Sequence, residues 1–226
     1  MSEVEQSTFK YHELQGSARA KARDHYIHSW LIDDWYDYVI DDAKADGKDK
    51  GFEIEHVYFS GFWSQGDGAS WIGDIDLVLF IEKHLPESIG RDCWVWMIQD
   101  GWIHNRLSVY QKGSHYSHSN TMSIGNIETY DYSNGEDGEE VNLINTACIL
   151  KGAPVQTLYD LIVADPNCPI KSVDDLEELA LTEARQFADE IYSTLQGAYE
   201  HECSDDNISE SYDANEVLFN EEGEVI

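Results

Sequence analysis

A long segment near the end of the chain, residues 172–199, has the apolar spacing of an α-helix. Apolar residues recur there at intervals of three and four, which places them on one face of a helix. The segment opens with SVDDLEE, which supplies an N-cap and acidic residues at the positive end of the helix dipole. We therefore predict one amphipathic helix over Ser172–Tyr199, with Phe187 and Ile191 in the core. The apolar positions are Leu176, Ala180, Ala184, Phe187, Ala188, Ile191, Leu195 and Ala198.

Helical spacing also appears near the start of the chain, between Ala18 and Ala45. The pair Asp33 and Asp34 lies inside this segment, and carboxylates favour the start of a second helix, so we predict two helices here. The sequence DGKDKG at 46–51 has the composition of a loop. The apolar positions of the segment are Ile27, Trp30, Leu31, Trp35, Val39 and Ala43.

Strand patterns occupy the middle of the chain. Polar and apolar residues alternate over Phe52–Ser60, and Trp71–Phe80 is rich in strand formers, so a hairpin with a wide glycine-rich loop is predicted. Residues 105–112 and 119–128 form a second predicted strand pair. Short helices are predicted over 86–103, 140–150 and 155–163. Strands grouped centrally and helices grouped at the ends predict an α+β fold, with an antiparallel sheet of hairpins packed against N- and C-terminal helices.

The last residues differ in composition from the rest of the chain. Residues 200–226 are rich in Asp and Glu and contain neither Lys nor Arg. We predict a single domain over 1–199, followed by an acidic C-terminal extension that is mobile. The alternative is a docked terminal hairpin, in which 217–219 pair with 225–226 across a turn at 222–223.

Net charge excludes several classes of function. With 14 Lys and Arg against 45 Asp and Glu, the formal charge is −31. A chain of this sign repels nucleic acid and anionic membranes, so neither is expected as a partner. Seven Trp and thirteen Tyr nevertheless indicate a globular protein, because charge-driven disorder goes with few aromatic residues.

Targeting and cysteine patterns point to the cytosol. The N-terminus MSEVEQSTFK has no secretory signal, and the longest aliphatic run, Leu77–Ile81, is too short to span a bilayer. The 4 cysteines are widely separated and form no CxxC pair, so we expect reduced thiols and neither a zinc knuckle nor a disulfide framework. No cofactor is expected.

The loop GFWSQGDGAS at Gly61–Ser70 is a candidate binding site. Its glycine spacing matches neither the dinucleotide fingerprint nor the P-loop, so a phosphate cradle is not predicted. One interpretation is a wide hairpin loop whose Trp63 covers the edge of the core. The other is a contact for a small ligand or a protein, made by Phe62, Trp63, Ser64, Gln65 and Asp67.

Carboxylates and histidines offer alternative chemistry. Asp74 and Asp76 lie two apart on a predicted strand, as a metal-dependent nucleotidyltransferase or hydrolase requires, but no helix fits between them and Gly61. A solvated strand face is the simpler interpretation. His104, His115 and His118 lack the spacing of metal ligands on a strand, so no metal is expected.

The motif YFSGFWSQGDGAS at Tyr58–Ser70 resembles a family of uncharacterised proteins of tailed bacteriophages. The resemblance extends upstream through DWYDYVIDDAKADGKDKG and downstream through YQKGSHYSHSNTMSI and the segment EIYSTLQGAYEHECSDDNISESYDANEVLFNEEGEV. Proteins of this family are sometimes labelled antitoxins of a toxin–antitoxin stability system. The resemblance implies phage origin and action in the host cytoplasm, and it implies no particular activity.

Charge is then the main indication of function. A compact chain of this length has a diameter of about 45 Å, and a duplex of that length carries about 26 phosphate charges. These magnitudes predict a DNA-like acidic protein that inhibits a host DNA-binding or defence protein with a basic surface. Alternatives are a binding module that uses the FWSQGDG loop, an enzyme that uses Asp74 and Asp76, and acidity that serves only solubility. The oligomeric state is left open. The carboxylates assigned to the partner surface are Glu136, Asp137, Glu139 and Glu140.

Overall fold

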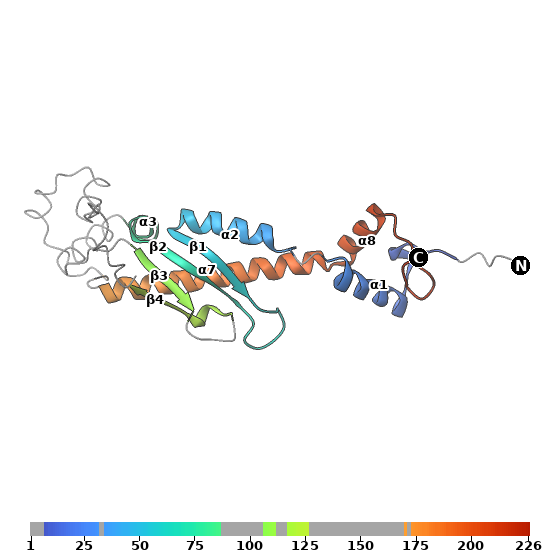
Figure 1. The fold of residues 1–226 in the computed structure, drawn as a ribbon, viewed down its shortest axis with the longest axis horizontal. Helices are drawn as coiled ribbons and strands as arrows, with labels where there is room; N and C mark the ends of the chain where they lie inside the picture. Colours follow the sequence, from blue (N-terminus) through green and yellow to red (C-terminus); the bar gives the residue numbers. More distant parts are fainter. Residues whose placement is uncertain (1–6, 32–33, 87–105, 112–116, 127–169, 171–172) are drawn as a thin grey trace, which may run out of the picture. The chain divides into compact units, whose positions relative to one another are not determined.

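Figure 1 shows the computed structural model of the chain, which describes residues 7–31, 34–86, 106–111, 117–126, 170 and 173–226. The chain forms two compact units. We call residues 40–192 the sheet unit, and residues 1–39 together with 193–226 the terminal unit. Helices and antiparallel strands are both present, so the predicted α+β class is confirmed. Within the described residues, no helix combines the length and apolar composition that crossing a bilayer requires.

The sheet unit is built on a four-stranded sheet whose strands follow one another in chain order. The strands are β1 (Phe52–Phe59), β2 (Ala69–Asp76), β3 (Arg106–Gln111) and β4 (Met122–Asn126), and each neighbouring pair is antiparallel. Both predicted strand pairs are therefore present as hairpins of one sheet. The wide glycine-rich loop joins β1 to β2, the two strands whose register closes at Phe59 opposite Ala69.

Helix α7 (Val173–Glu202) confirms the predicted long helix, and its sheet-unit part packs on one face of the sheet (Figure 1). The ring of Phe187 lies 5.5 Å from that of Phe52 on β1. The indole N–H of Trp71 on β2 donates to the carbonyl of Ala184, at 3.1 Å. Phe187 and Ile191 are 5% and 3% exposed, as expected for core positions. The apolar period therefore correctly identified the face that covers the sheet.

Two short segments differ from the predictions. Helix α2 (Asp37–Asp49) continues through most of the segment 46–51, which was predicted as a loop. Gly47 lies inside this helix and packs closely on its neighbours. A Cβ at this position would lie 2.9 Å from Ile54 Cδ1 and 3.2 Å from a ring atom of Phe187. The chain turns only at Gly51, where φ is +89°. Here glycine permits close packing of a helix and does not end it.

The predicted strand Trp71–Phe80 is wrong in its second half. β2 ends at Asp76, and helix α3 (Leu77–His84) begins at the next residue. The Asp76 carboxylate accepts hydrogen bonds from the N–H groups of Val78 at 3.0 Å and Leu79 at 3.1 Å, so it is the N-cap of α3. A short apolar run such as Leu77–Ile81 is typical of a buried strand and of a buried helix, so the run alone does not distinguish between them.

The terminal unit joins the two ends of the chain. It contains η1 (Tyr11–Glu13), α1 (Gly16–Ser29) and α8 (Asp205–Ala214). Phe219 forms antiparallel bridges with both Phe9 and Val225, and the N–H of Ile226 donates to the carbonyl of Leu218. The core of the unit consists of Tyr11, Leu14, Ala22, Tyr26, Ile208, Tyr212 and Phe219.

Residues 200–226 thus belong to a folded unit, which the division of the chain at residue 199 did not anticipate. The docked hairpin, which the sequence left as an alternative, corresponds to the arrangement around Phe219 and Val225. Ile208 and Tyr212 lie four residues apart on one face of α8 and are buried, although the segment around them is acidic.

Candidate functional site

The loop between β1 and β2 is closed at its base by hydrogen bonds. The N–H of Ser60 donates to the carbonyl of Gly68 at 3.0 Å, and the N–H of Gly68 donates to the Ser60 hydroxyl at 3.1 Å. Gly66 has φ +100°, a conformation that favours glycine. The loop therefore continues the β-hairpin with a defined geometry.

Asp67 organises the interior of this loop. One of its carboxylate oxygens accepts the backbone N–H groups of Trp63 at 2.9 Å and Ser64 at 2.6 Å, while its own N–H donates to the Ser64 carbonyl at 3.1 Å. An Asp side chain that bonds nearby backbone in this way fixes a turn. Because the carboxylate already takes these two N–H groups, they are not available to cradle a phosphate.

Phe62 and Tyr192 connect the loop to the body of the sheet unit. The Phe62 ring lies 6.1 Å from the Phe59 ring and 5.6 Å from the Tyr192 ring on α7. The Tyr192 hydroxyl donates to the carbonyl of Gly61 at 3.1 Å. Burial, and then the charge of Asp67, raise the pKa of the Tyr192 phenol, so this group keeps the proton that it donates.

Trp63 has the opposite orientation. It is 73% exposed, and its ring meets the Phe62 ring edge-on at 5.9 Å. The interpretation in which Trp63 covers the edge of the core is therefore wrong, because Phe62 makes the inward contacts. Ser64 and Gln65 are exposed beside it, and Asp67 is half-buried. The loop thus brings the five predicted binding residues together and presents Trp63 to solvent.

His118 supports the other side of the loop base. A Cβ at Gly68 would lie 2.9 Å from the His118 ring, so only glycine permits this approach. The His118 Nδ1 accepts the N–H of Asn120 at 3.0 Å and caps η2 (Ser119–Thr121). No local pattern indicates the contact of His118 with Gly68 or that of Tyr192 with Gly61, because the residues of each pair are distant along the chain. His104 and His115 lie outside the described residues, and among the described ones no group of three His, Cys, Asp or Glu could hold a metal ion.

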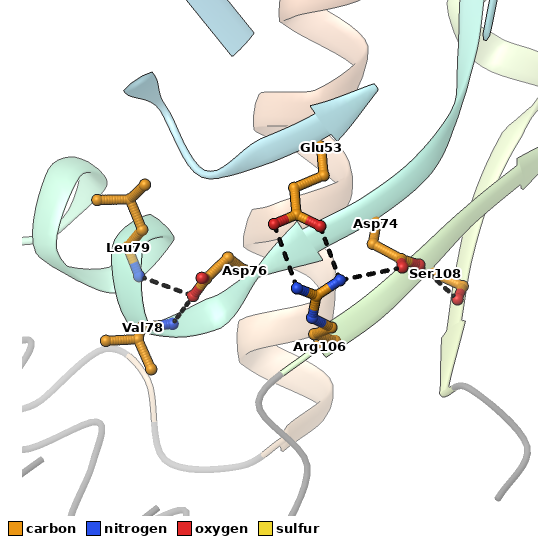
Figure 2. Close-up of polar contacts among 7 residues, drawn as sticks. All are labelled: Glu53, Asp74, Asp76, Val78, Leu79, Arg106 and Ser108. Atoms are coloured by element: carbon orange, nitrogen blue, oxygen red, sulfur yellow. Dashed lines mark hydrogen bonds and ion pairs between the residues drawn. The ribbon is translucent and has the colours of Figure 1, made fainter. Parts of the chain in front are cut away.

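Asp74 and Asp76 make different structural contacts, as Figure 2 shows. The Asp74 carboxylate accepts the Ser108 hydroxyl at 2.9 Å and lies 3.6 Å from the Arg106 guanidinium. Arg106 also binds both oxygens of Glu53, at 2.7 and 3.2 Å. Asp76 instead points to the first turn of α3. A cation near Asp74 would therefore compete with Arg106, and Asp76 already caps a helix.

A hollow of about 350 Å³ lies beside α7 in the sheet unit. Lys50 Nζ lies 3.0 Å from Glu190, and His84 Nδ1 lies 3.3 Å from Glu183. Asp49 and Lys83 also line the hollow, so it presents groups of both signs.

Ion pairs also involve cations elsewhere in the chain. In the terminal unit, Lys10 pairs with Asp213 at 2.9 Å and Lys21 pairs with Glu224 at 2.7 Å. Exposed carboxylates outside these pairs lie on both units. The predicted acidic group Glu136, Asp137, Glu139 and Glu140 lies outside the described residues. Exposed carboxylates that the structure does describe include Asp41, Asp42, Asp46, Glu55, Asp206, Glu210, Glu216, Glu221 and Glu222.

Comparison with known proteins gives a family and no activity. No curated protein matches the chain, and no solved structure matches it. One family model, described as a domain of unknown function, matches residues 35–205. That range includes the whole four-stranded sheet, the β1–β2 loop and all of α7. Since the match covers well over half of the sequence, the chain belongs to the domain family of unknown function DUF8835.

Proposed function

We propose that the protein binds a basic host protein, a DNA-binding or defence protein, by presenting a surface whose charge imitates a DNA duplex. In this proposal the chain is phage-encoded and acts in the host cytoplasm, and it binds neither nucleic acid nor membrane. Its effect on the host protein is inhibition, because it occupies the groove that DNA would occupy.

The proposal is supported by the ion pairs that Lys and Arg side chains form with carboxylates of the same chain. Lys10, Lys21, Lys50 and Arg106 each lie within 3.0 Å of a carboxylate of the chain itself. Their charges are therefore neutralised locally, while the chain as a whole has a formal charge of −31. A partner approaching the protein therefore meets a surface with a negative net charge. Such a charge raises the rate of association with a basic surface.

The proposal is tested by neutralising exposed carboxylates in each unit separately. One variant carries Glu210→Gln, Glu221→Gln and Glu222→Gln in the terminal unit, and the other carries Asp41→Asn, Asp42→Asn and Asp46→Asn on α2. Basic proteins retained from a bacterial lysate are identified, purified and used to measure association rates. Both variants should associate several-fold more slowly at low salt, and the difference should vanish at about 1 M salt, where the Debye length is about 3 Å.

A matched control keeps the charge and changes the shape. Glu210→Asp, Glu221→Asp and Glu222→Asp should associate at the rate of the unmodified protein. Equal slowing by this control and by the Gln variant would contradict a mechanism based on diffuse charge. So would a partner whose association is indifferent to salt.

The β1–β2 loop favours a second candidate function, a binding module for a small molecule or a host protein in which the charge is incidental. The exposure of Trp63 on an ordered loop supports it. Changing Glu136, Asp137, Glu139 and Glu140 together to amides separates the two candidates when compared with Trp63→Ala. Charge mimicry predicts the larger loss of affinity for the fourfold variant, and the module predicts the larger loss for Trp63→Ala.

The metal-dependent enzyme remains the weakest alternative. Its two carboxylates, Asp74 and Asp76, contribute to an ion pair and to a helix cap respectively. A catalytic pair must direct its oxygens to one metal site. Neither contact supports such a site.

A further inference from the structure

We propose that the β1–β2 loop is the receptor for a single cationic side chain, an arginine or a lysine, of the basic partner. Trp63 would provide the aromatic surface for the cation, and Asp67 the nearby negative charge. This inference rests on the proposed function, because it assumes that the partner is basic. It adds a localised contact to an attraction that is otherwise diffuse.

The first argument is the order of the loop before binding. Asp67 holds the backbone of Trp63 and Ser64, and Tyr192 holds the carbonyl of Gly61. Because these contacts form during folding, binding does not have to order the backbone that carries the indole. An ordered aromatic side chain is the usual anchor of a protein interface.

The second argument is the chemistry of the exposed surface. The indole is the side chain with the strongest attraction for a cation over its face. It is 73% exposed, the most exposed of the large hydrophobic side chains in the described part of the chain. The exposed face of this ring is therefore a suitable surface for a cationic side chain.

The third argument is the sign of the surrounding charge. The segment from Gly51 to Glu82 contains no Lys and no Arg. Asp67 lies within the loop itself, and its charge reaches Tyr192, where it contributes to the raised pKa of the phenol. An incoming cation therefore meets attraction from Asp67 and no repulsion from a basic residue of its own hairpin. An anionic group would instead be repelled by Asp67.

The probe for the test is a synthetic peptide of alternating arginine and glycine. Its control is the same peptide with citrulline in place of arginine, which keeps the shape of the side chain and removes the charge. The full chain is labelled with 5-fluorotryptophan, and the Trp63 fluorine resonance is assigned from its loss in Trp63→Phe. The arginine peptide should shift this resonance, and the citrulline peptide should not.

Affinity gives the second readout. Trp63→Leu keeps an apolar side chain and removes the aromatic face, so the dissociation constant for the arginine peptide should rise about 2- to 30-fold. Tyr110→Leu is the matched control, since Tyr110 is an exposed aromatic residue on β3. It should leave the dissociation constant unchanged.

The outcomes separate this inference from the proposed function. A Trp63 resonance that does not respond while the arginine peptide binds would overturn the loop as the receptor and leave charge mimicry standing. Equal shifts with the citrulline peptide would overturn the assignment of a cation. Loss of affinity in the Glu210, Glu221 and Glu222 amide variant without any loss in Trp63→Leu would also refute the inference, while supporting the proposed function.

Discussion

The two units of the chain stabilise their cores by different means. In the sheet unit, α7 covers a sheet whose buried side chains are mostly without polar atoms, such as Phe52, Ile75 and Leu107. In the terminal unit, three tyrosines lie in the core, and each hydroxyl has a partner. Tyr11 donates to Asp205 at 2.7 Å, Tyr212 donates to the Ala22 carbonyl at 3.0 Å, and Tyr26 lies 3.1 Å from the Ser211 hydroxyl.

The difference shows how a strongly acidic segment can still fold. Residues 200–226 contribute Ile208, Tyr212 and Phe219 to this core, and the Tyr212 ring meets its neighbours edge-on or tilted. Tyr212 lies 4.9 Å from Phe219, 5.2 Å from Trp30 and 5.4 Å from Tyr26. Aromatic residues bury a large area each, and tyrosine also satisfies polar groups within the core. We therefore expect the sheet unit to respond most to changes in apolar packing, and the terminal unit to respond to hydroxyl groups and pH.

The largest effect is expected at Phe187 of α7. Phe187→Asp removes a ring that packs on Phe52 and places a carboxylate in the core, so the free energy of unfolding should fall by about 4 kcal/mol or more. Denaturant unfolding and hydrogen exchange of β1 and β2 amides measure this loss. Phe187→Leu should cost less, about 1–2 kcal/mol. An unchanged melting temperature in Phe187→Asp would refute the assignment of this face as core.

A smaller effect is expected when one hydroxyl is removed from the terminal unit. Tyr212→Phe keeps the ring and removes a buried hydroxyl that bonds the Ala22 carbonyl and lies 3.1 Å from His25 Nδ1, which should cost about 1–2 kcal/mol. Tyr26→Phe removes a partly buried bond to Ser211 and should cost about 0.5–1 kcal/mol. Hydrogen exchange of α1 and α8 amides reports both changes. If the two variants were equally stable, the comparison between buried and partly buried hydroxyls would fail.

Alkaline pH should destabilise the terminal unit through the same residue. Burial raises the pKa of Tyr212, and the neighbouring Tyr11 and Tyr26 raise it further. A phenol whose pKa is higher in the folded state stabilises the fold below its unfolded pKa of about 10, and the stability falls as the pH rises above that value. Thermal melts between pH 8 and pH 11, followed by tyrosinate absorbance, measure the decline. Tyr212→Phe should make the decline shallower, and an identical decline in that variant would contradict the assignment.

The smallest effect is expected at the exposed pair of Lys21 and Glu224. The hydrogen bonds from Lys21 and then Asn220 lower the pKa of Glu224, so its contribution is present above the ordinary range of a glutamate and is lost as the pH falls. Exposed pairs contribute little, so Lys21→Ala should barely change the melting temperature at neutral pH. The Glu224 carboxyl resonance should titrate at higher pH in Lys21→Ala. A resonance that titrates as before would show that Lys21 is not its partner.

Local patterns in the sequence predicted most of the fold. The apolar period of α7 extends over many turns, so its core face was identified, including Phe187 and Ile191. The end of β2 at Asp76 was not predicted. Asp76 caps helix α3, but the apolar residues that follow it are also typical of a strand. The folded state of residues 200–226 depends on Phe9 and Ala22, almost the length of the chain away, and no local pattern contains that information.

The candidate site was predictable in its residues and not in their orientations. The composition of the FWSQGDG loop identified Phe62, Trp63 and Asp67 together. Which of the two aromatic rings points outward depends on Tyr192, which lies far along the chain and binds Gly61. The role of Asp67 has a local signal, since Asp commonly bonds backbone N–H groups in turns. The roles of Asp74 and Ser108 required the register of β2 and β3.

The most direct test of the proposed function is competition with DNA for one basic partner. A host protein retained at low salt is immobilised with the acidic chain bound, and duplex DNA is added in increasing amounts at two salt concentrations. Charge mimicry predicts that the duplex displaces the chain completely, and that the chain and the duplex both bind the partner more weakly at the higher salt. A chain that stays bound at saturating duplex, with an affinity indifferent to salt, would contradict the proposal.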